Sequence, residues 1–143
     1  MKRLTNQRGI AAVEFLTVLP LLLFILLAVA EFGQAFITFN VLNKQAQNGI
    51  RYATSAIQGT ASYDQIANET NIKNMVVYGK VTPNFDDESS VKNLTTNNVT
   101  VDHSNGYVTI SINYNYIPII DFIPTSLDLE FPLNTSVVMR TLP

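Results

Sequence analysis

The sequence predicts an α+β protein, in which a long N-terminal transmembrane helix continues into an extracytoplasmic domain with a small antiparallel β-sheet packed on the helix. Three observations predict this class. Residues 10–30 form an apolar run of membrane-spanning length, residues 32–57 continue a helical pattern, and the chain after Gly59 alternates apolar and polar residues. A sheet of three or four strands is barely stable alone, so we expect the helix to cover its apolar face.

Composition excludes several classes of function. The 143 residues carry nine Lys and Arg against eleven Asp and Glu, for a net charge of −2, so no basic surface is available to bind nucleic acid. Cysteine is absent and histidine occurs once, which removes thiolate metal sites and leaves few catalytic groups. We therefore expect no enzyme activity, no cofactor or metal, and no nucleic-acid or small-molecule partner.

The run from residue 10 to residue 30 is interrupted only by Glu14, Thr17 and Pro20. As a helix its 21 residues would be about 31 Å long, enough to cross a bilayer core. A basic flank precedes it, made up of Lys2, Arg3 and Arg8. The positive-inside rule holds such a flank in the cytoplasm, so the rest of the chain is predicted to face outward.

The helical pattern continues beyond the membrane segment. No proline falls between Pro20 and Pro83, and Gln58-Gly59 offers a stop signal, so one continuous helix is predicted over residues 10–57. Apolar side chains recur along it at spacings of three and four. We expect the stripe to pack the helix on the sheet through Phe32, Phe36, Phe39, Ile50 and Ile57.

The segment after the helix is less regular. A short amphipathic helix is predicted over Tyr63–Lys73, with Ile66 and Ile72 as its apolar anchors. The sequence MVVYGKVT at Met75–Thr82 is rich in β-branched residues and predicts a strand, and Pro83–Ser90 predicts a polar loop.

A β-hairpin is predicted from two runs, Val99–Asp102 and Tyr107–Tyr116, which flank His103–Gly106. The Asn105-Gly106 dipeptide is a strong turn signal because both residues tolerate positive φ. The second run alternates strictly and gives one apolar face, made up of Val108, Ile110, Ile112, Tyr114 and Tyr116.

The final strand is predicted from alternation over Leu127–Asn134, and Thr135–Arg140 either continues or follows it. Pro132 cannot donate a ladder hydrogen bond, so this strand should lie at an edge or carry a bulge.

The residues Arg8–Phe15, with the sequence RGIAAVEF, are the most informative stretch. A carboxylate inside an apolar run costs about 2.5–3.5 kcal/mol on insertion scales, so such a group usually has a partner. A basic leader ending in glycine, then four small or apolar residues, Glu and an aromatic, resembles the class III signal of type IV pilin-like proteins. More closely, residues 8–36 resemble the TadE-like pseudopilins of the tight-adherence (Flp) pilus system.

This resemblance implies a prepilin-peptidase substrate of the bacterial inner membrane that serves pilus assembly and surface attachment or secretion. Gly9 would be the last residue of a cytoplasmic leader, residues 1–9, and Ile10 the mature N-terminus. Glu14 would be the fifth-position carboxylate, paired with the Ile10 ammonium of a neighbouring subunit, and Phe15 the aromatic that follows. Major Flp pilins prefer Tyr at this position and are much shorter, which favours a minor pseudopilin.

The resulting organisation is a leader over residues 1–9, a helix over 10–57 that spans the membrane over 10–30, and a β-rich region over 58–143 on the periplasmic or extracellular side. The implied partners are the prepilin peptidase, other pilins and pseudopilins, and the inner-membrane assembly machinery.

Alternative interpretations remain open. Ala28-Val29-Ala30 resembles the cleavage site of a secretory signal, although the helical pattern continues past it. A single-pass anchor could present a periplasmic binding or adaptor domain outside any pilus. Asp102-His103-Ser104 cannot converge as a catalytic triad from one hairpin, and Asp86-Asp87-Glu88 lacks the ligand spacing of a calcium loop, which favours a solvated acidic loop.

Overall fold

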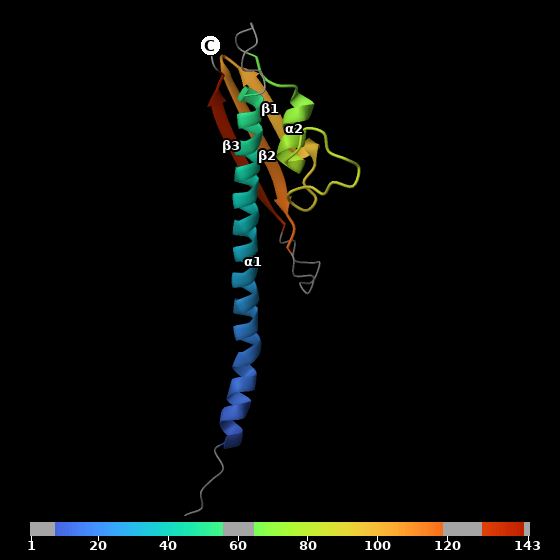
Figure 1. The fold of residues 1–143 in the computed structure, drawn as a ribbon. Coiled ribbons are helices and arrows are strands. Elements are labelled where there is room, and N and C mark those ends of the chain that lie inside the picture. The colour runs from blue at the N-terminus through green and yellow to red at the C-terminus, as the bar shows by residue number, and fades with distance from the viewer. Residues whose placement is uncertain (1–7, 56–64, 119–129, 142–143) are drawn as a thin grey trace, which may run out of the picture.

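The computed structural model describes residues 8–55, 65–118 and 130–141 and confirms the predicted α+β class (Figure 1). Its elements are α1 (Arg8–Ser55), α2 (Glu69–Tyr78), the 3-10 helix η1 (Thr96–Asn98), β1 (Val99–Ser104), β2 (Tyr107–Tyr116) and β3 (Phe131–Arg140). The three strands form one antiparallel sheet in the order β1-β2-β3.

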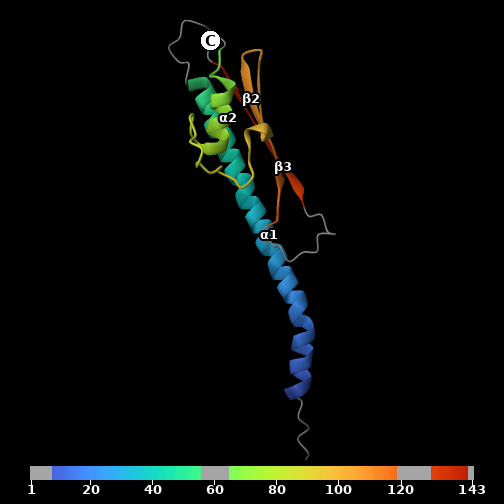
Figure 2. The same ribbon diagram turned by 90° about the vertical axis from the view of Figure 1, so that its right-hand side faces the viewer.

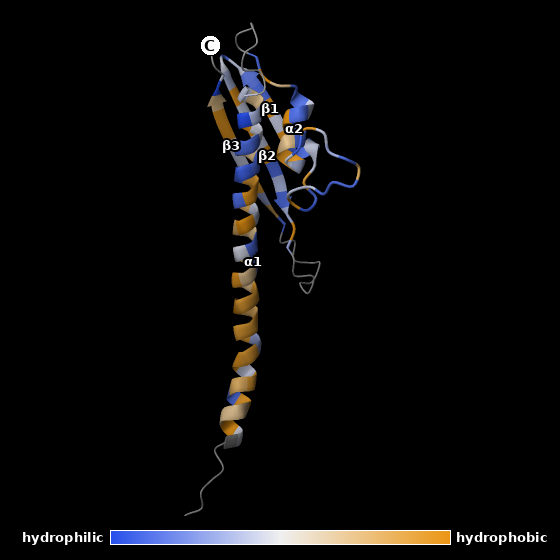
Figure 3. Cartoon of the chain, viewed as in Figure 1, coloured by the Kyte–Doolittle hydropathy of each residue, from blue (hydrophilic) through white to orange (hydrophobic). Residues whose placement is uncertain are grey.

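Two layers make up the domain. Both helices lie on the same face of the sheet, and Figure 2 shows the strands to the right of the helices in a layer of their own. Only the outer half of α1, residues 31–55, takes part in this packing. The apolar half, residues 9–30, extends beyond the sheet as a single exposed helix (Figure 3).

Helix α1 has 48 residues, which corresponds to about 72 Å at 1.5 Å per residue. It begins at Arg8, two residues before the predicted start at Ile10. The predicted end at Gln58-Gly59, and Ile57 with it, lies outside the described residues. The uninterrupted course from the apolar half into the domain agrees with the sequence prediction.

The predicted packing of α1 on the sheet is wrong at Phe32 and Phe36. Phe32 and Phe36 are 73% and 66% exposed, while Phe39 is half-buried and Ile50 is buried. The buried face of α1 consists of four small residues, Ala35, Ala46, Gly49 and Ala53, together with Leu42 and Ile50. Small side chains let the helix backbone approach the sheet closely, which turns the bulky phenylalanines away from it.

The strand predicted at Met75–Thr82 is wrong, because Met75–Tyr78 is helical and residues 79–82 are irregular. Helix α2 begins after Asn68, whose side chain accepts a 2.9 Å hydrogen bond from the Thr70 amide. It ends at Tyr78 and is capped by Gly79, which has a left-handed conformation with φ of 69°. These caps define a helix despite its β-branched residues. The helix is shifted from the predicted Tyr63–Lys73 because its buried face, Ile72, Val76 and Val77, packs against α1.

The hairpin prediction is confirmed, with a shorter turn than expected. Asn105 and Gly106 have φ values of 52° and 75°, the positive values that a two-residue turn requires. His103 and Ser104 belong to β1 and pair with Val108 and Tyr107.

Strand β3 is an edge strand that continues from Phe131 through Arg140 without interruption. Pro132 pairs with Asn115 at the edge, where a missing amide donor is tolerated. The predicted positions Leu127 and Leu129 lie outside the described residues.

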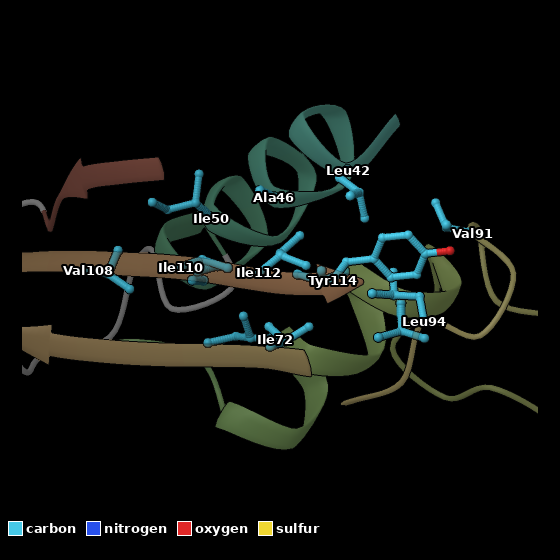
Figure 4. Packing of buried hydrophobic residues seen from close by; sticks show 14 of the residues in the cluster. Leu42, Ala46, Ile50, Ile72, Val91, Leu94, Val108, Ile110, Ile112 and Tyr114 are labelled. Carbon is cyan, nitrogen blue, oxygen red and sulfur yellow. The ribbon is translucent and has the colours of Figure 1, made fainter. Parts of the chain in front are cut away.

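The outer half of α1 runs alongside β3 in the same direction. The Thr135 hydroxyl donates to Oδ1 of Asn43, and further out the Thr54 hydroxyl contacts the Met139 sulfur at 3.3 Å. The core lies between these layers, and Figure 4 shows side chains from α1, α2 and the sheet meeting there. Its largest fully buried members are Leu42, Ile50, Ile72, Val76, Val77, Val99, Val108, Ile110 and Ile112.

Candidate functional site in the N-terminal helix

The predicted cleavage position lies in the first turn of α1. Arg8, Gly9 and Ile10 are all helical, so the peptide bond between Gly9 and Ile10 is part of that turn. A Cβ atom added at Gly9 would meet nothing within 4 Å. Packing within the described part of the chain therefore does not require glycine here, and glycine weakens a helix by about 1 kcal/mol relative to alanine.

Glu14 lies one helical turn after Ile10, and positions four apart share a helix face. Glu14 is exposed, and so are its neighbours Ile10 and Phe15, at 70% and 59%. Within the described part of the chain, Glu14 makes no hydrogen bond or ion pair. An ion-pair partner for this carboxylate would therefore have to come from another molecule or from a side chain outside the described ones.

The apolar half of α1 has the properties of a membrane-crossing segment. Among the described residues, α1 alone is long and apolar enough to cross a bilayer, and no residue of its most apolar stretch is buried. The Thr17 hydroxyl donates a 2.7 Å hydrogen bond to the Val13 carbonyl, so this polar group is satisfied within the helix. Pro20 lies inside the helix without ending it.

A second notable position is the junction between the apolar half and the domain. The Tyr116 hydroxyl donates a 2.7 Å hydrogen bond to Oε1 of Glu31, and the Tyr116 side chain is only 2% exposed. Burial and the adjacent carboxylate raise the pKa of Tyr116 well above its ordinary value. Sequence analysis missed this contact. Its signals are that Glu31 directly follows the apolar run and that Tyr116 is the last member of the alternating strand.

The other candidate groups have structural environments. Asp102 and Ser104 are exposed on one face of β1, while His103 between them points to the other face, so the three cannot converge. Asp87 forms a 2.6 Å ion pair with Lys80 and accepts a hydrogen bond from the Asn84 amide, which lowers the pKa of its carboxyl. Within the described ranges, no group of three or more His, Asp or Glu residues is placed to hold a metal ion.

The remaining predicted residues of the leader cannot be placed. Lys2 and Arg3 lie outside the described residues, and of Arg8 only the helical backbone is described. Gly9, Ile10, Glu14 and Phe15 are brought together on the first two turns of one exposed helix.

Comparison with known proteins confirms the resemblance noted from the motif. The model of the family described as TadE-like protein matches residues 9–51. The match begins at the glycine of the motif and ends close to the last residue of α1, so it covers both the apolar half and the outer half of the helix. No significant match is found among curated proteins or among solved structures.

Proposed function

We propose that the chain is a minor pseudopilin that takes part in assembly of a tight-adherence (Flp) type IV pilus. The observation that carries this proposal is the spacing of Gly9 and Glu14 on an exposed helix of membrane-spanning length, within the region that matches the TadE-like family. In this proposal residues 1–9 are a cytoplasmic leader, α1 crosses the inner membrane, and the domain lies on the periplasmic side.

A prepilin peptidase would cut between Gly9 and Ile10. Cleavage requires the first turn of α1 to open, and two features make opening easy. The first four amide groups of a helix have no carbonyl partner within it, and Gly9 has neither a side chain nor a packing contact to lose. Because a side chain at position 9 would meet no described atom, recognition by the peptidase explains the glycine better than packing does.

After the cut, the new ammonium of Ile10 and the carboxylate of Glu14 would lie one turn apart on each subunit. A carboxylate exposed to lipid is costly, and pairing with the ammonium of a neighbouring subunit would neutralise both charges. In the uncut chain Glu14 has no partner among the described residues, so its carboxylate is available for such a pair. Pairing would then favour one axial register between neighbouring subunits.

An intact-mass measurement of the protein extracted from its native membrane tests this proposal. Loss of residues 1–9 is expected, and a Gly9→Leu variant should remain uncut. Loss of residues 1–30 would identify a secretory signal. An unshortened chain would support the alternative of a single-pass anchor with a periplasmic binding or adaptor domain.

A further inference from the structure

One end of the sheet lies level with the point where α1 leaves its apolar half. Tyr116, the last residue of β2, pairs with Phe131, the first residue of β3, and their rings are 5.1 Å apart. The hydroxyl of the same Tyr116 bonds to Glu31, which directly follows the membrane segment that ends at Ala30. Figure 1 shows this end of β2 and β3 on the side of the domain that faces the apolar half.

Exposed apolar side chains gather at this level. We define the membrane-proximal collar as Phe32, Phe36, Ile37, Ile117 and Phe131, which are 73%, 66%, 55%, 46% and 37% exposed. Elsewhere in the described part of the domain, large apolar side chains are exposed only singly, at Phe85, Tyr107 and Val138. Isolated exposed residues are normal, but the collar continues the exposed apolar surface of the membrane segment into the domain.

Lengths along the helix place the collar in the interfacial layer of a bilayer. Residues 10–30 are about 31 Å long and fill a hydrocarbon core of about 30 Å. The polar layer on each side is roughly 5–8 Å thick, because the whole bilayer measures about 40–45 Å. Phe32 lies about 3 Å beyond Ala30 along the helix, inside this layer, and the backbone of Phe36 lies about 9 Å beyond Ala30, at its outer edge. Because helical side chains lean toward the N-terminus, the Phe36 ring extends back into the layer.

The charge pattern indicates that apolar burial, and not attraction to anionic lipid, would hold the collar there. No Lys or Arg occurs between Arg8 and Lys44, and none occurs between Lys92 and Arg140. Both segments of the collar, one on α1 and one at the end of the sheet, lie within these stretches. The carboxylate at this level, Glu31, accepts the hydrogen bond from Tyr116.

We propose that the collar is embedded in the headgroup and upper acyl layer of the leaflet on the domain side, so that the domain sits on the membrane at a fixed depth. The occupant of this apolar surface is phospholipid. The Tyr116–Glu31 hydrogen bond sets the depth of the sheet because it joins the sheet end to the helix at the membrane surface. This inference rests on the membrane span of α1 but not on pilus assembly.

Single-tryptophan variants of the full chain test this proposal, because the protein contains no native tryptophan. Phe36→Trp and Phe131→Trp report on the two segments of the collar. Phe24→Trp reports on the membrane segment, and Phe85→Trp, at a residue whose exposure is complete, reports on water. Each variant is reconstituted into phosphatidylcholine vesicles that contain lipids brominated either near the headgroup or near the chain end.

We expect Phe36→Trp and Phe131→Trp to emit at shorter wavelength than Phe85→Trp and to be quenched more strongly by the shallow bromine than by the deep one. Phe24→Trp should show the opposite preference, and raising the NaCl concentration to 0.5 M should change neither result. Adding Tyr116→Phe should weaken quenching of Phe131→Trp but leave Phe36→Trp unchanged.

Three results would overturn the proposal. If Phe24→Trp is quenched while both collar positions behave like Phe85→Trp, the domain stands clear of the membrane although the helix spans it. If Phe24→Trp itself is not quenched, α1 does not cross the bilayer. The collar proposal is then wrong as well, because it rests on that membrane span. If the short-wavelength emission of Phe131→Trp is lost when the ratio of protein to lipid is lowered, the collar faces a second copy of the chain.

Discussion

The Tyr116 hydroxyl donates a 2.7 Å hydrogen bond to Oε1 of Glu31 across 85 positions of the sequence. The bond joins the end of the central strand to the turn of α1 that follows the apolar half. Together with the contacts of Asn43 to Thr135 and Thr54 to Met139, it holds the sheet along the outer half of α1. The outer half of the helix is therefore part of the folded domain.

Replacing Tyr116 with Phe should destabilise the domain by about 1.5 kcal/mol, the lower end of the range for hydrogen bonds to charged groups, because Glu31 is partly exposed. The free energy of unfolding of the full chain in detergent measures the effect. Tyr107→Phe is the matched control, since Tyr107 is 50% exposed and its loss should change stability by less than about 0.5 kcal/mol. Equal effects of the two substitutions would contradict a special role for the Tyr116 hydroxyl.

Alkaline pH should destabilise the domain through the same residue. Because the pKa of Tyr116 is raised in the folded state, the unfolded chain loses this proton first as the pH rises. The stabilisation is therefore complete below the unfolded pKa of about 10 and is lost progressively above it. We expect the melting temperature to fall as the pH rises above about 10, and Tyr116→Phe to show a smaller fall than Tyr107→Phe. Parallel curves for the two variants would refute this assignment.

Local sequence signals predicted the hairpin well because the decisive residues are adjacent. Asn105-Gly106 specifies the turn, and strict alternation in Tyr107–Tyr116 specifies the buried face. The same local reasoning failed at Met75–Tyr78. There the β-branched Val76 and Val77 favour a strand, but the caps at Asn68 and Gly79 and the contact with α1 determine a helix.

The contact between α1 and α2 depends on Gly49. A Cβ atom at Gly49 would overlap Cγ2 of Val76 and come within 3.3 Å of Cδ1 of Ile110. Gly49→Ala gains about 1 kcal/mol of helix propensity but overpacks a buried site, which typically costs about 1–3 kcal/mol. We expect net destabilisation of about 1 kcal/mol, measured by equilibrium unfolding.

A double-mutant cycle separates the two contributions to this effect. In a Val76→Ala background the overlap disappears, so Gly49→Ala should become neutral or stabilising there. The same cost in both backgrounds would show that Val76 does not limit the approach of the two helices.

The sequence motif predicted which residues make up the candidate site and how they are spaced. The spacing of Gly9 and Glu14 is visible in the sequence, and the structure places both on one exposed helix. The packing face of α1 was not predictable in the same way. Large phenylalanines dominate any apolar pattern, whereas the real contact uses Ala35, Ala46 and Gly49, whose value is that they allow close approach. The Tyr116–Glu31 contact joins residues too distant in sequence for a local pattern to connect.

The outer half of α1 should be required for the domain to fold. A chain shortened to begin at Glu31 keeps Leu42, Ala46 and Ile50, which are all fully buried against the sheet and α2. It should unfold cooperatively in a thermal melt followed by circular dichroism. A chain that begins at Gln65 exposes the face of the sheet that α1 covers and should show no cooperative transition. A cooperative melt of the shorter chain would mean that α1 is only a stalk.

Glu14→Val separates an assembling pseudopilin from an anchored binding domain. The substitution removes a charge from the apolar half, so insertion into the membrane should be unchanged or improved, and cleavage after Gly9 should persist. If Glu14 pairs with the ammonium of a neighbouring subunit, losing one partner of a poorly hydrated pair costs about 3–5 kcal/mol and should abolish incorporation into the pilus. Co-purification of the variant with sheared pili measures incorporation.

Thr17→Val is the matched control for this change. It also replaces a polar side chain of the apolar half with valine, but the Thr17 hydroxyl is already bonded to the Val13 carbonyl within the same helix, so no contact between subunits depends on it. We therefore expect Thr17→Val to be incorporated normally at the same protein level at which Glu14→Val is excluded. Normal pilus production and normal co-purification of Glu14→Val would refute the charge-pairing mechanism and favour the single-pass anchor, because an anchor needs no carboxylate at this position.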